Sequence, residues 1–308
     1  GSTFQMQKGE QLVQTGYGFS SDRLIENLGA ASSIYILAND KKEYRYQAFF
    51  GRANYIFNDR YILNLTGRRD GSSRFGPGKQ FANFWAFGGA WLISKEKFLE
   101  ESTLLSFAKI RGSYGITGSD QIGDYQFLDT YSTTGIAYGG QIGLQPTRLY
   151  NPNFAWETNR KFEAALEAGF LKDRVFLTAA FYRNKSSNQL TGIPLPGTTG
   201  FSSVQANFDA VVENTGTEIT LRTSNIEIAN FSWSTSFNIS FSKNRLLSFP
   251  GLEGSTYASR YVIGNSLNIL KLYKYEGVNP ETGIYQFADT NGDGTVDYLD
   301  MTEVADLT

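Results

Sequence analysis

The residues most clearly arranged for chemistry form an acidic loop near the C-terminal end of the sequence. Oxygen-bearing side chains stand at positions 1, 3, 5, 9 and 12 of a twelve-residue segment: Asp289, Asn291, Asp293, Asp297 and Asp300. Gly294 stands at position 6, and Thr295 at position 7 could add its backbone carbonyl. This is the spacing of a calcium-binding loop, and Ca²⁺ prefers six to eight hard oxygen ligands. The pattern therefore predicts a cation site with a structural role.

Two features of the acidic loop leave a simpler interpretation open. Position 12 is Asp300, not the longer glutamate that reaches a metal with both oxygens. The residues just upstream, 284–287, are typical of a strand and not of the helix that precedes such loops. The alternative is an acidic turn that stays in solvent.

A second candidate site consists of aromatic side chains in the long segment 117–156. Its rings stand among amides and hydroxyls with few charges: Tyr125, Tyr131, Tyr138, Tyr150 and Trp156. Exposed rings of this kind suit sugar or peptide ligands. The alternative, which we favour, is that the rings pack this segment against its neighbours.

The composition excludes several classes of protein. The chain has 308 residues, no histidine and no cysteine, so His-based triads, thiol catalysis and cysteine zinc sites are excluded. A net charge of −2 gives no case for nucleic acid. Glu163 and Glu167 could form a glycosidase pair, but alternation puts them on a charged strand face beside Lys161. We therefore expect no enzyme.

The elements that position these sites show two-residue periodicity, which is typical of strands with two different faces. Eight segments show it: 49–57, 61–68, 85–93, 108–116, 161–170, 175–184, 218–222 and 231–242. The last is the clearest, with Phe231, Trp233 and Phe237 on one face and serine or asparagine between them. The sequence therefore predicts an all-β, antiparallel protein.

The apolar face of these strands could be the core of a soluble sandwich or the lipid-facing wall of a barrel. Three features favour the barrel. The strands reach about ten residues, longer than the usual five to six, and aromatic residues gather near their ends. Short links at 58–60, 171–174 and 225–230 alternate with long ones at 70–82, 117–156 and 185–216. We expect an antiparallel transmembrane β-barrel wall with long extracellular loops.

This interpretation divides the chain into three regions. Residues 1–45 lack sustained alternation and are expected to form a loop or irregular segment. Residues 46–245 are expected to hold the antiparallel barrel strands and their long external loops, and residues 246–308 an external loop region that carries the acidic loop.

Several different short motifs follow one another along the chain in a characteristic order. They are Phe50–Tyr55 with Asp59–Tyr61, Arg69–Gly76, Arg111–Gly118, Ile122–Tyr125, Asn151–Thr158, Val212–Gly216, Tyr275–Gly283 and the acidic loop. Together they resemble the SusC/RagA-like family of TonB-linked outer-membrane transporters, from about residue 45 to about residue 300.

The resemblance implies a large barrel in the bacterial outer membrane with an N-terminal plug. Such proteins import oligosaccharides or peptides, driven by TonB, with a SusD-like surface lipoprotein as a lid. Large transporters have about 22 strands, so we expect this chain to be a partial barrel with the plug absent. It would contact outer-membrane lipid, and TonB would act through the missing N-terminal part.

A cell-surface β-rich binding or adhesion domain with a calcium-stabilised loop is the alternative function. Detergent dependence separates the two, because a lipid-facing wall requires an amphiphile and an adhesion domain does not.

Overall fold

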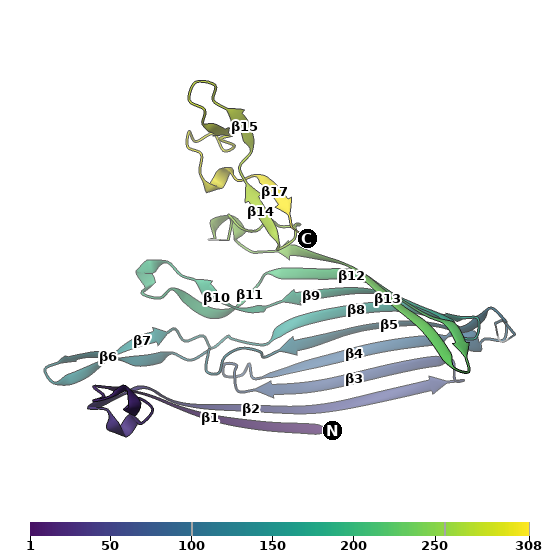
Figure 1. Ribbon diagram of the computed structural model, residues 1–308, viewed down its shortest axis with the longest axis horizontal. Coiled ribbons are helices and arrows are strands. Elements are labelled where there is room, and N and C mark those ends of the chain that lie inside the picture. Colours follow the sequence, from purple (N-terminus) through teal and green to yellow (C-terminus); the bar gives the residue numbers. More distant parts are fainter. Residues whose placement is uncertain (100, 256, 308) are drawn as a thin grey trace.

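A nine-stranded antiparallel sheet dominates the computed structural model, which describes residues 1–99, 101–255 and 257–307 (Figure 1). The strands follow one another in the sheet in chain order: β1 (Ser2–Tyr17), β2 (Ser33–Phe57), β3 (Tyr61–Ser72), β4 (Phe81–Leu92), β5 (Leu105–Ser119), β8 (Glu157–Phe170), β9 (Val175–Ser187), β12 (Val211–Ile228) and β13 (Phe231–Ser248). Apart from Ile93, which follows the end of β4, all eight segments predicted from alternation lie in strands of this sheet. The prediction of an all-β, antiparallel fold is confirmed.

The connections alternate in length, and the two kinds lie at opposite ends of the strands. Two hairpins extend one end of the sheet, β6 (Thr130–Tyr138) with β7 (Gln141–Arg148) and β10 (Gln189–Pro194) with β11 (Ser203–Phe208) (Figure 1). Tight turns close the other end. In the first, Asn58 and Asp59 have φ of 50° and 53°, the left-handed conformation that hairpin turns need and that asparagine and aspartate tolerate.

The N-terminal region differs from the prediction. Residues 1–45 were expected to be a loop or irregular segment, yet β1 pairs with β2 from Ser2 to Tyr17. The connection between them holds short 3₁₀ turns at Asp22–Leu24 and Leu28–Ala30, and a register shift interrupts the pairing between Val13 and Gln14. The prediction failed because both faces of this ribbon carry polar residues, so the strands show no apolar alternation. Lys8–Glu43 and Lys41–Glu10 ion pairs join them across the ribbon instead.

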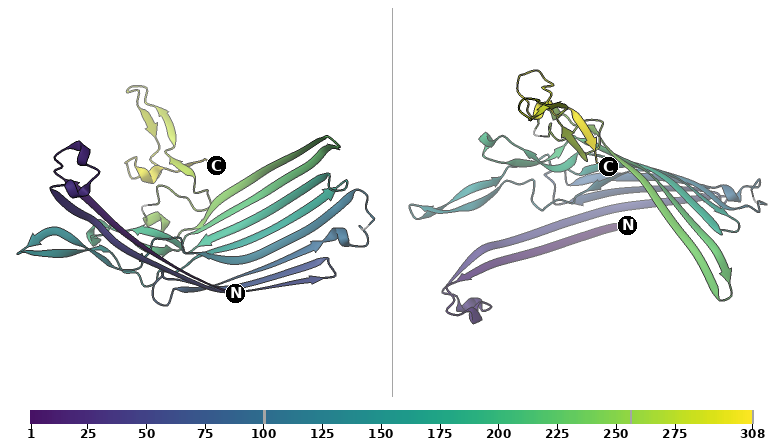
Figure 2. Two further views of the ribbon diagram at one scale, coloured as in Figure 1. Left: turned by 60° about the horizontal axis from the view of Figure 1, so that its bottom comes forward. Right: turned by 45° about the horizontal axis from the view of Figure 1, so that its top comes forward.

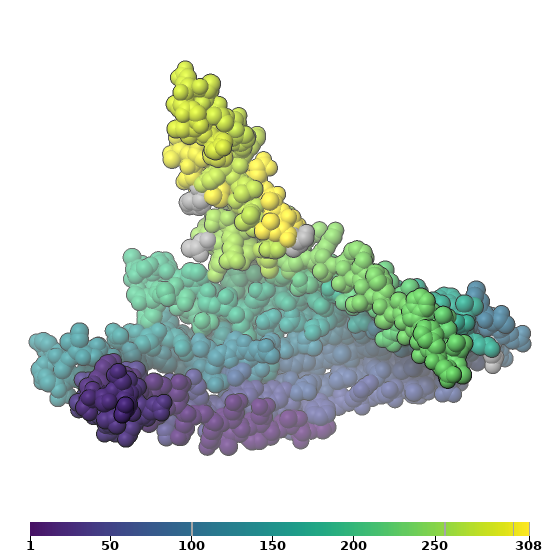
Figure 3. Space-filling model, in the orientation of Figure 1, coloured from purple at the N-terminus to yellow at the C-terminus, as the bar shows by residue number. Residues whose placement is uncertain are grey.

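The C-terminal region stands out from the sheet as a separate lobe (Figures 1 and 3). It contains two small two-stranded sheets, β14 (Ile269–Leu272) with β17 (Glu303–Asp306) and β15 (Tyr275–Val278) with β16 (Tyr285–Phe287). The 3₁₀ turns η5 (Leu252–Gly254) and η6 (Tyr298–Asp300) lie in the same region, and η3 (Ile93–Lys95) and η4 (Gly197–Thr199) lie in loops of the wall.

The sheet is strongly curved (Figure 2), and among the residues that the structure describes its apolar face is left uncovered. Large side chains on that face stay exposed, among them Phe237 at 54% and Trp233 at 53%. The two buried apolar clusters lie instead at the end of the strands that carries the long loops. Within the described residues, no helix is long and apolar enough to cross a membrane.

Candidate functional site

The apolar side chains form continuous rows across five strands, because the register through β5, β8, β9, β12 and β13 is unbroken over this stretch. One row contains Ile110, Leu166, Ala179, Ile219 and Ile239, and the next contains Ala108, Ala168, Leu177, Leu221 and Phe237. Because strand side chains alternate between faces, these rows share one face. The result is an apolar band on which Ile110, Leu166, Phe237 and Ile239 are exposed.

The height of this band matches the apolar belt of a membrane barrel. On β8 it runs from Phe162 to Phe170, a rise of eight residue steps, or roughly 26 Å at about 3.3 Å per step. Tilting of the strands shortens its projection, and outer-membrane barrels carry an apolar band about 25 Å tall. The face is therefore sized for lipid.

An aromatic girdle borders the band near the tight turns. Tyr61 and Trp91 stack there with ring centroids 6.2 Å apart. The Tyr61 hydroxyl and the Trp91 indole N–H both donate to Glu96, at 2.8 and 3.0 Å, and Arg60 donates to it at 2.9 Å. The Trp91 and Tyr61 hydrogen bonds lower the pKa of Glu96. This arrangement fixes two amphipathic rings where apolar and aqueous surroundings meet.

The opposite face of the sheet is polar and rich in ion pairs. Glu167 accepts from Arg111 Nε at 2.9 Å and lies 3.4 Å from Lys109 Nζ, while Glu163 pairs with the same Arg111. Glu163 and Glu167, the two carboxylates considered as a glycosidase pair, are thus held by basic side chains on a charged strand face. A hollow of about 900 Å³ opens beside them, lined by residues such as Ser113 and Lys161.

The external loops are joined by contacts between residues far apart in the sequence. Arg74, from the segment after β3, donates to Asp124 at 2.8 Å and to the Asp120 carbonyl at 2.9 Å, and it lies over the Tyr44 ring at 4.2 Å. Arg68, in contrast, forms a local ion pair with Asp70. The long-range role of Arg74 was missed, since no local pattern indicates its partner.

One aromatic cluster forms the centre of this loop assembly. Phe75, Phe84, Phe154 and Trp156 are buried together, and the Phe75 and Trp156 ring centroids lie 4.9 Å apart. Gly76 lies against the same region, where an added Cβ would stand 2.3 Å from the Pro152 carbonyl oxygen. Only glycine therefore permits this approach of the two segments.

The five candidate contact aromatics have different surroundings. Trp156 is buried in the cluster just described and its indole donates to the Gln80 carbonyl at 2.8 Å, so its contacts are those of the packing alternative. Tyr125 is half-buried, and its hydroxyl accepts from the Glu43 amide at 2.8 Å. In contrast Tyr131, Tyr138 and Tyr150 are exposed, Tyr138 at 93%. Three of the five rings are accessible to a ligand.

The acidic loop is organised by its own backbone amides. The buried Asp300 accepts hydrogen bonds from the N–H groups of Thr290 and Asn291 through one oxygen, at 2.7 and 3.2 Å, and from that of Asp297 through the other, at 2.9 Å. The Asp297 amide is the chief cause of a lowered pKa at Asp300. Asp289 accepts from Gly292 and Gly294, at 2.7 Å each.

The remaining predicted ligands curl the loop locally. Asn291, Asp293 and Asp297 each accept from the amide two residues further on, at 2.8 to 2.9 Å. The backbone N–H of Thr295 donates the hydrogen bond that Asp293 accepts. Among residues 1–99, 101–255 and 257–307, no three acidic, histidine or cysteine side chains converge as metal ligands would. The loop in this form is a self-capped turn.

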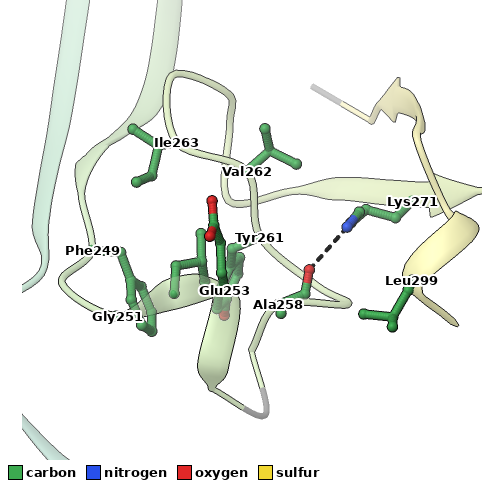
Figure 4. A pocket seen from close by; sticks show the side chains of 10 residues that line it. Phe249, Gly251, Glu253, Ala258, Tyr261, Val262, Ile263, Lys271 and Leu299 are labelled. Atoms are coloured by element: carbon green, nitrogen blue, oxygen red, sulfur yellow. Dashed lines mark hydrogen bonds between the residues drawn. The ribbon is translucent and has the colours of Figure 1, made fainter. Parts of the chain in front are cut away.

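A hollow of about 580 Å³ lies between the acidic loop and the segment that follows β13 (Figure 4). Phe249, Tyr261 and Leu299 contribute to its lining, and Lys271 donates to the Ala258 carbonyl at 2.9 Å. Glu253 is the acidic side chain of the lining (Figure 4). The hollow therefore joins residues of the C-terminal lobe to the buried cluster around Phe249.

Residues 2–303 match the family described as TonB dependent receptor-like, beta-barrel. TonB-dependent receptor P26 of Formosa agariphila is 30% identical, over 96% of this chain and 32% of that protein. TonB-dependent receptor SusC of Bacteroides thetaiotaomicron is 29% identical, over 81% of this chain and 27% of that protein.

Solved structures show the same likeness. The structure of the RagAB peptide transporter superposes with a TM-score of 0.79 at 27% identity, over 92% of this chain and 32% of that one. The "closed-closed" state of the RagAB peptide importer gives a TM-score of 0.79 at 26% identity, over the whole of this chain. The chain spans about a third of the length of the proteins that it matches.

Proposed function

This chain belongs to the TonB dependent receptor-like β-barrel family, and we propose that, within a complete receptor, it forms part of the wall and external loops of an importer for oligosaccharides or peptides. Members of this family are outer-membrane barrel proteins and not enzymes. The family assignment favours the transporter over the surface-adhesion alternative.

The observation that carries the proposal is the two-faced sheet, whose apolar side stays uncovered among the described residues. Its apolar band is exposed, whereas its polar face holds Arg111, Glu163 and Glu167 beside a large hollow. In a soluble protein an uncovered apolar band of this size would be a liability. In a membrane barrel the same band faces lipid and the polar face lines the lumen.

The partners of the complete receptor belong to the same proposal. A SusD-like surface lipoprotein would cover the end with the long loops, and TonB would supply the driving force through another part of the receptor. The support comes from the relatives, which are named TonB-dependent receptors, and from the RagAB structures, which are described as a peptide transporter and importer.

Cargo contact is proposed for the exposed rings Tyr131, Tyr138 and Tyr150. Their exposure supports it, because a ring that is already packed has no free face to offer. Alanine at Tyr131 and Tyr138 in the full-length receptor should lower uptake of labelled oligosaccharide or peptide without changing its surface abundance. Unchanged uptake of both cargo classes would remove these rings from the site.

For the acidic loop we also propose calcium binding, with Asp289, Asn291, Asp293, Thr295, Asp297 and Asp300 as ligands. The spacing supports it, and the Asp289 hydrogen bonds to Gly292 and Gly294 already curl the chain. To bind the ion, the loop carboxylates would have to turn inward from their present amide partners. With a short residue at position 12 we expect weak affinity, about 10⁻⁴–10⁻³ M.

Calorimetric titration of the full-length receptor with Ca²⁺ tests this proposal. We expect a millimolar-range binding signal that disappears in Asp293→Ala, whereas an Asp209→Ala control outside the loop should retain it. If the parent gives no signal up to several millimolar, the loop is only a self-capped turn.

A further inference from the structure

Basic side chains gather on the apolar face at the edge of the band and one row beyond it, at the end with the long loops. Two rows of the sheet carry them. The first contains Ile116, Arg160, Lys185, Glu213 and Arg245, and the second, one step nearer the band, contains Tyr114, Phe162, Arg183, Thr215 and Lys243. We call the five cations, Arg160, Arg183, Lys185, Lys243 and Arg245, the basic rim.

Charge is distributed unequally between the two faces of the wall. Across the described strands β3, β4, β5, β8, β9, β12 and β13, Glu213 is the one acidic residue on the apolar face. The polar face of the same strands carries Asp70, Glu157, Glu163, Glu167, Glu218 and Glu227. Five cations against one carboxylate leave the rim strongly positive.

Glu213 does not neutralise the rim. It is buried and accepts from Arg183 at 2.6 Å, and Lys185 Nζ lies 3.5 Å from the same oxygen. One carboxylate therefore orders two of the cations. Arg160, Lys243 and Arg245 are exposed on the same face.

The rim borders an amphipathic hollow. Tyr114, Phe162 and Phe181 line its side toward the band, around about 700 Å³. Arg183 stands in the same row as Phe162, and Arg160, Lys185 and Glu213 line the hollow one row further out. The Phe162 and Phe181 rings lie 6.5 Å apart. An occupant of this hollow would meet an apolar, aromatic surface on one side and cations on the other.

We propose that the basic rim binds the phosphorylated headgroup of an outer-leaflet lipid, whose acyl chains lie on the apolar band. Arginine and lysine form charge-assisted hydrogen bonds to phosphate oxygens, and cations near an anionic membrane surface add to binding. The position favours a lipid over cargo, because this face points away from the polar lining of the wall. The inference rests on the proposed membrane orientation.

Lipid titration of the full-length receptor in detergent tests the basic rim. The probe is diphosphorylated lipid A in mixed micelles, compared with dephosphorylated lipid A and with inorganic phosphate. Arg160→Gln/Lys185→Gln should weaken binding of the phosphorylated lipid roughly 25-fold, at about fivefold for each cation. The matched control Lys161→Gln/Arg222→Gln removes two cations from the polar face and should leave affinity unchanged.

Glu213→Gln supplies a test of opposite sign, since removal of the one carboxylate should tighten binding. Equal losses in the two double variants, or equal affinity for phosphorylated and dephosphorylated lipid, would overturn the proposal. Competition by millimolar inorganic phosphate would assign the rim to free phosphate instead. Heat-modifiable mobility on gels shows separately whether each variant forms a barrel, so failure of the membrane-wall assignment is distinguishable from failure of the lipid site.

Discussion

The wall of the sheet and the external loop assembly are built by different physical means. Long strands in continuous register hold the wall, with Phe237 and similar side chains left exposed on its apolar face. In the loops, Phe75, Phe154 and Trp156 are buried among residues distant in sequence. The wall therefore depends on its surroundings for the burial of apolar surface, whereas the loops supply their own.

Because of this difference, substitutions in the two regions should have different effects. A change in the aromatic cluster should loosen the loops and spare the wall, because the strand register does not depend on it. A charge on the apolar band should do the reverse, because it changes transfer into lipid. The region that a substitution spares therefore serves as the reference for the region that it damages.

The largest effect is expected from Phe154→Ala. The ring is fully buried, and truncation of a buried Phe costs about 3–5 kcal/mol. We expect faster protease cleavage of the external loops, with barrel formation retained on heat-modifiability gels. Tyr138 is exposed, so the loops of Tyr138→Ala should be cleaved as slowly as those of the parent. Parental protease resistance in Phe154→Ala would contradict the assignment of this cluster as the centre of the loops.

A smaller but still severe effect is expected from Phe237→Arg on the band. A cation facing the middle of the bilayer costs about 2–4 kcal/mol, so the folded, inserted fraction should fall. The neighbouring Asn238→Arg puts the same charge on the polar face and should be mild. Equal loss of surface abundance in both variants would show that the lipid-facing side has been assigned wrongly.

The smallest effect concerns the acidic loop and pH. The pKa of Asp300 lies below its usual value of 3.8, so its stabilisation is complete above that value and is lost as the pH falls through the lowered one. Protease protection of residues 289–300 should therefore decrease as the medium is acidified below about pH 4. In Asp300→Asn the loop should be equally susceptible to protease at every pH in this range. If this variant loses protection on acidification as the parent does, another group is responsible for the titration.

Several elements of the wall follow from the sequence, but its N-terminal ribbon does not. Alternation is a local signal, and from Phe231 to Phe241 it indicates both a strand and its apolar face. Between Ser2 and Arg45 the signal is missing, although the backbones of β1 and β2 pair along the whole of β1. Main-chain hydrogen bonds do not require an apolar face, so pairing of two polar strands leaves no periodic trace.

The candidate sites depended more on tertiary structure than the fold did. Spacing alone predicted a calcium loop, but the structure turns Asp300 toward the amides of Thr290 and Asn291. Composition made Trp156 and Tyr138 equivalent candidates, yet one is buried and the other exposed. The burial of a side chain depends on which residues pack against it. The sequence of the segment 117–156 does not show which other segments those residues come from.

By itself, the sequence determined the strand class, the alternation of short and long links, and the family motifs, because each depends on residues close together in the chain. Only the tertiary structure decided the Arg74–Asp124 pair and the basic rim. Basic residues interrupt the apolar alternation near the external ends of β8, β9 and β13, and that was a visible signal. Whether they meet depends on the register between strands, which non-local hydrogen bonds set and no single strand specifies.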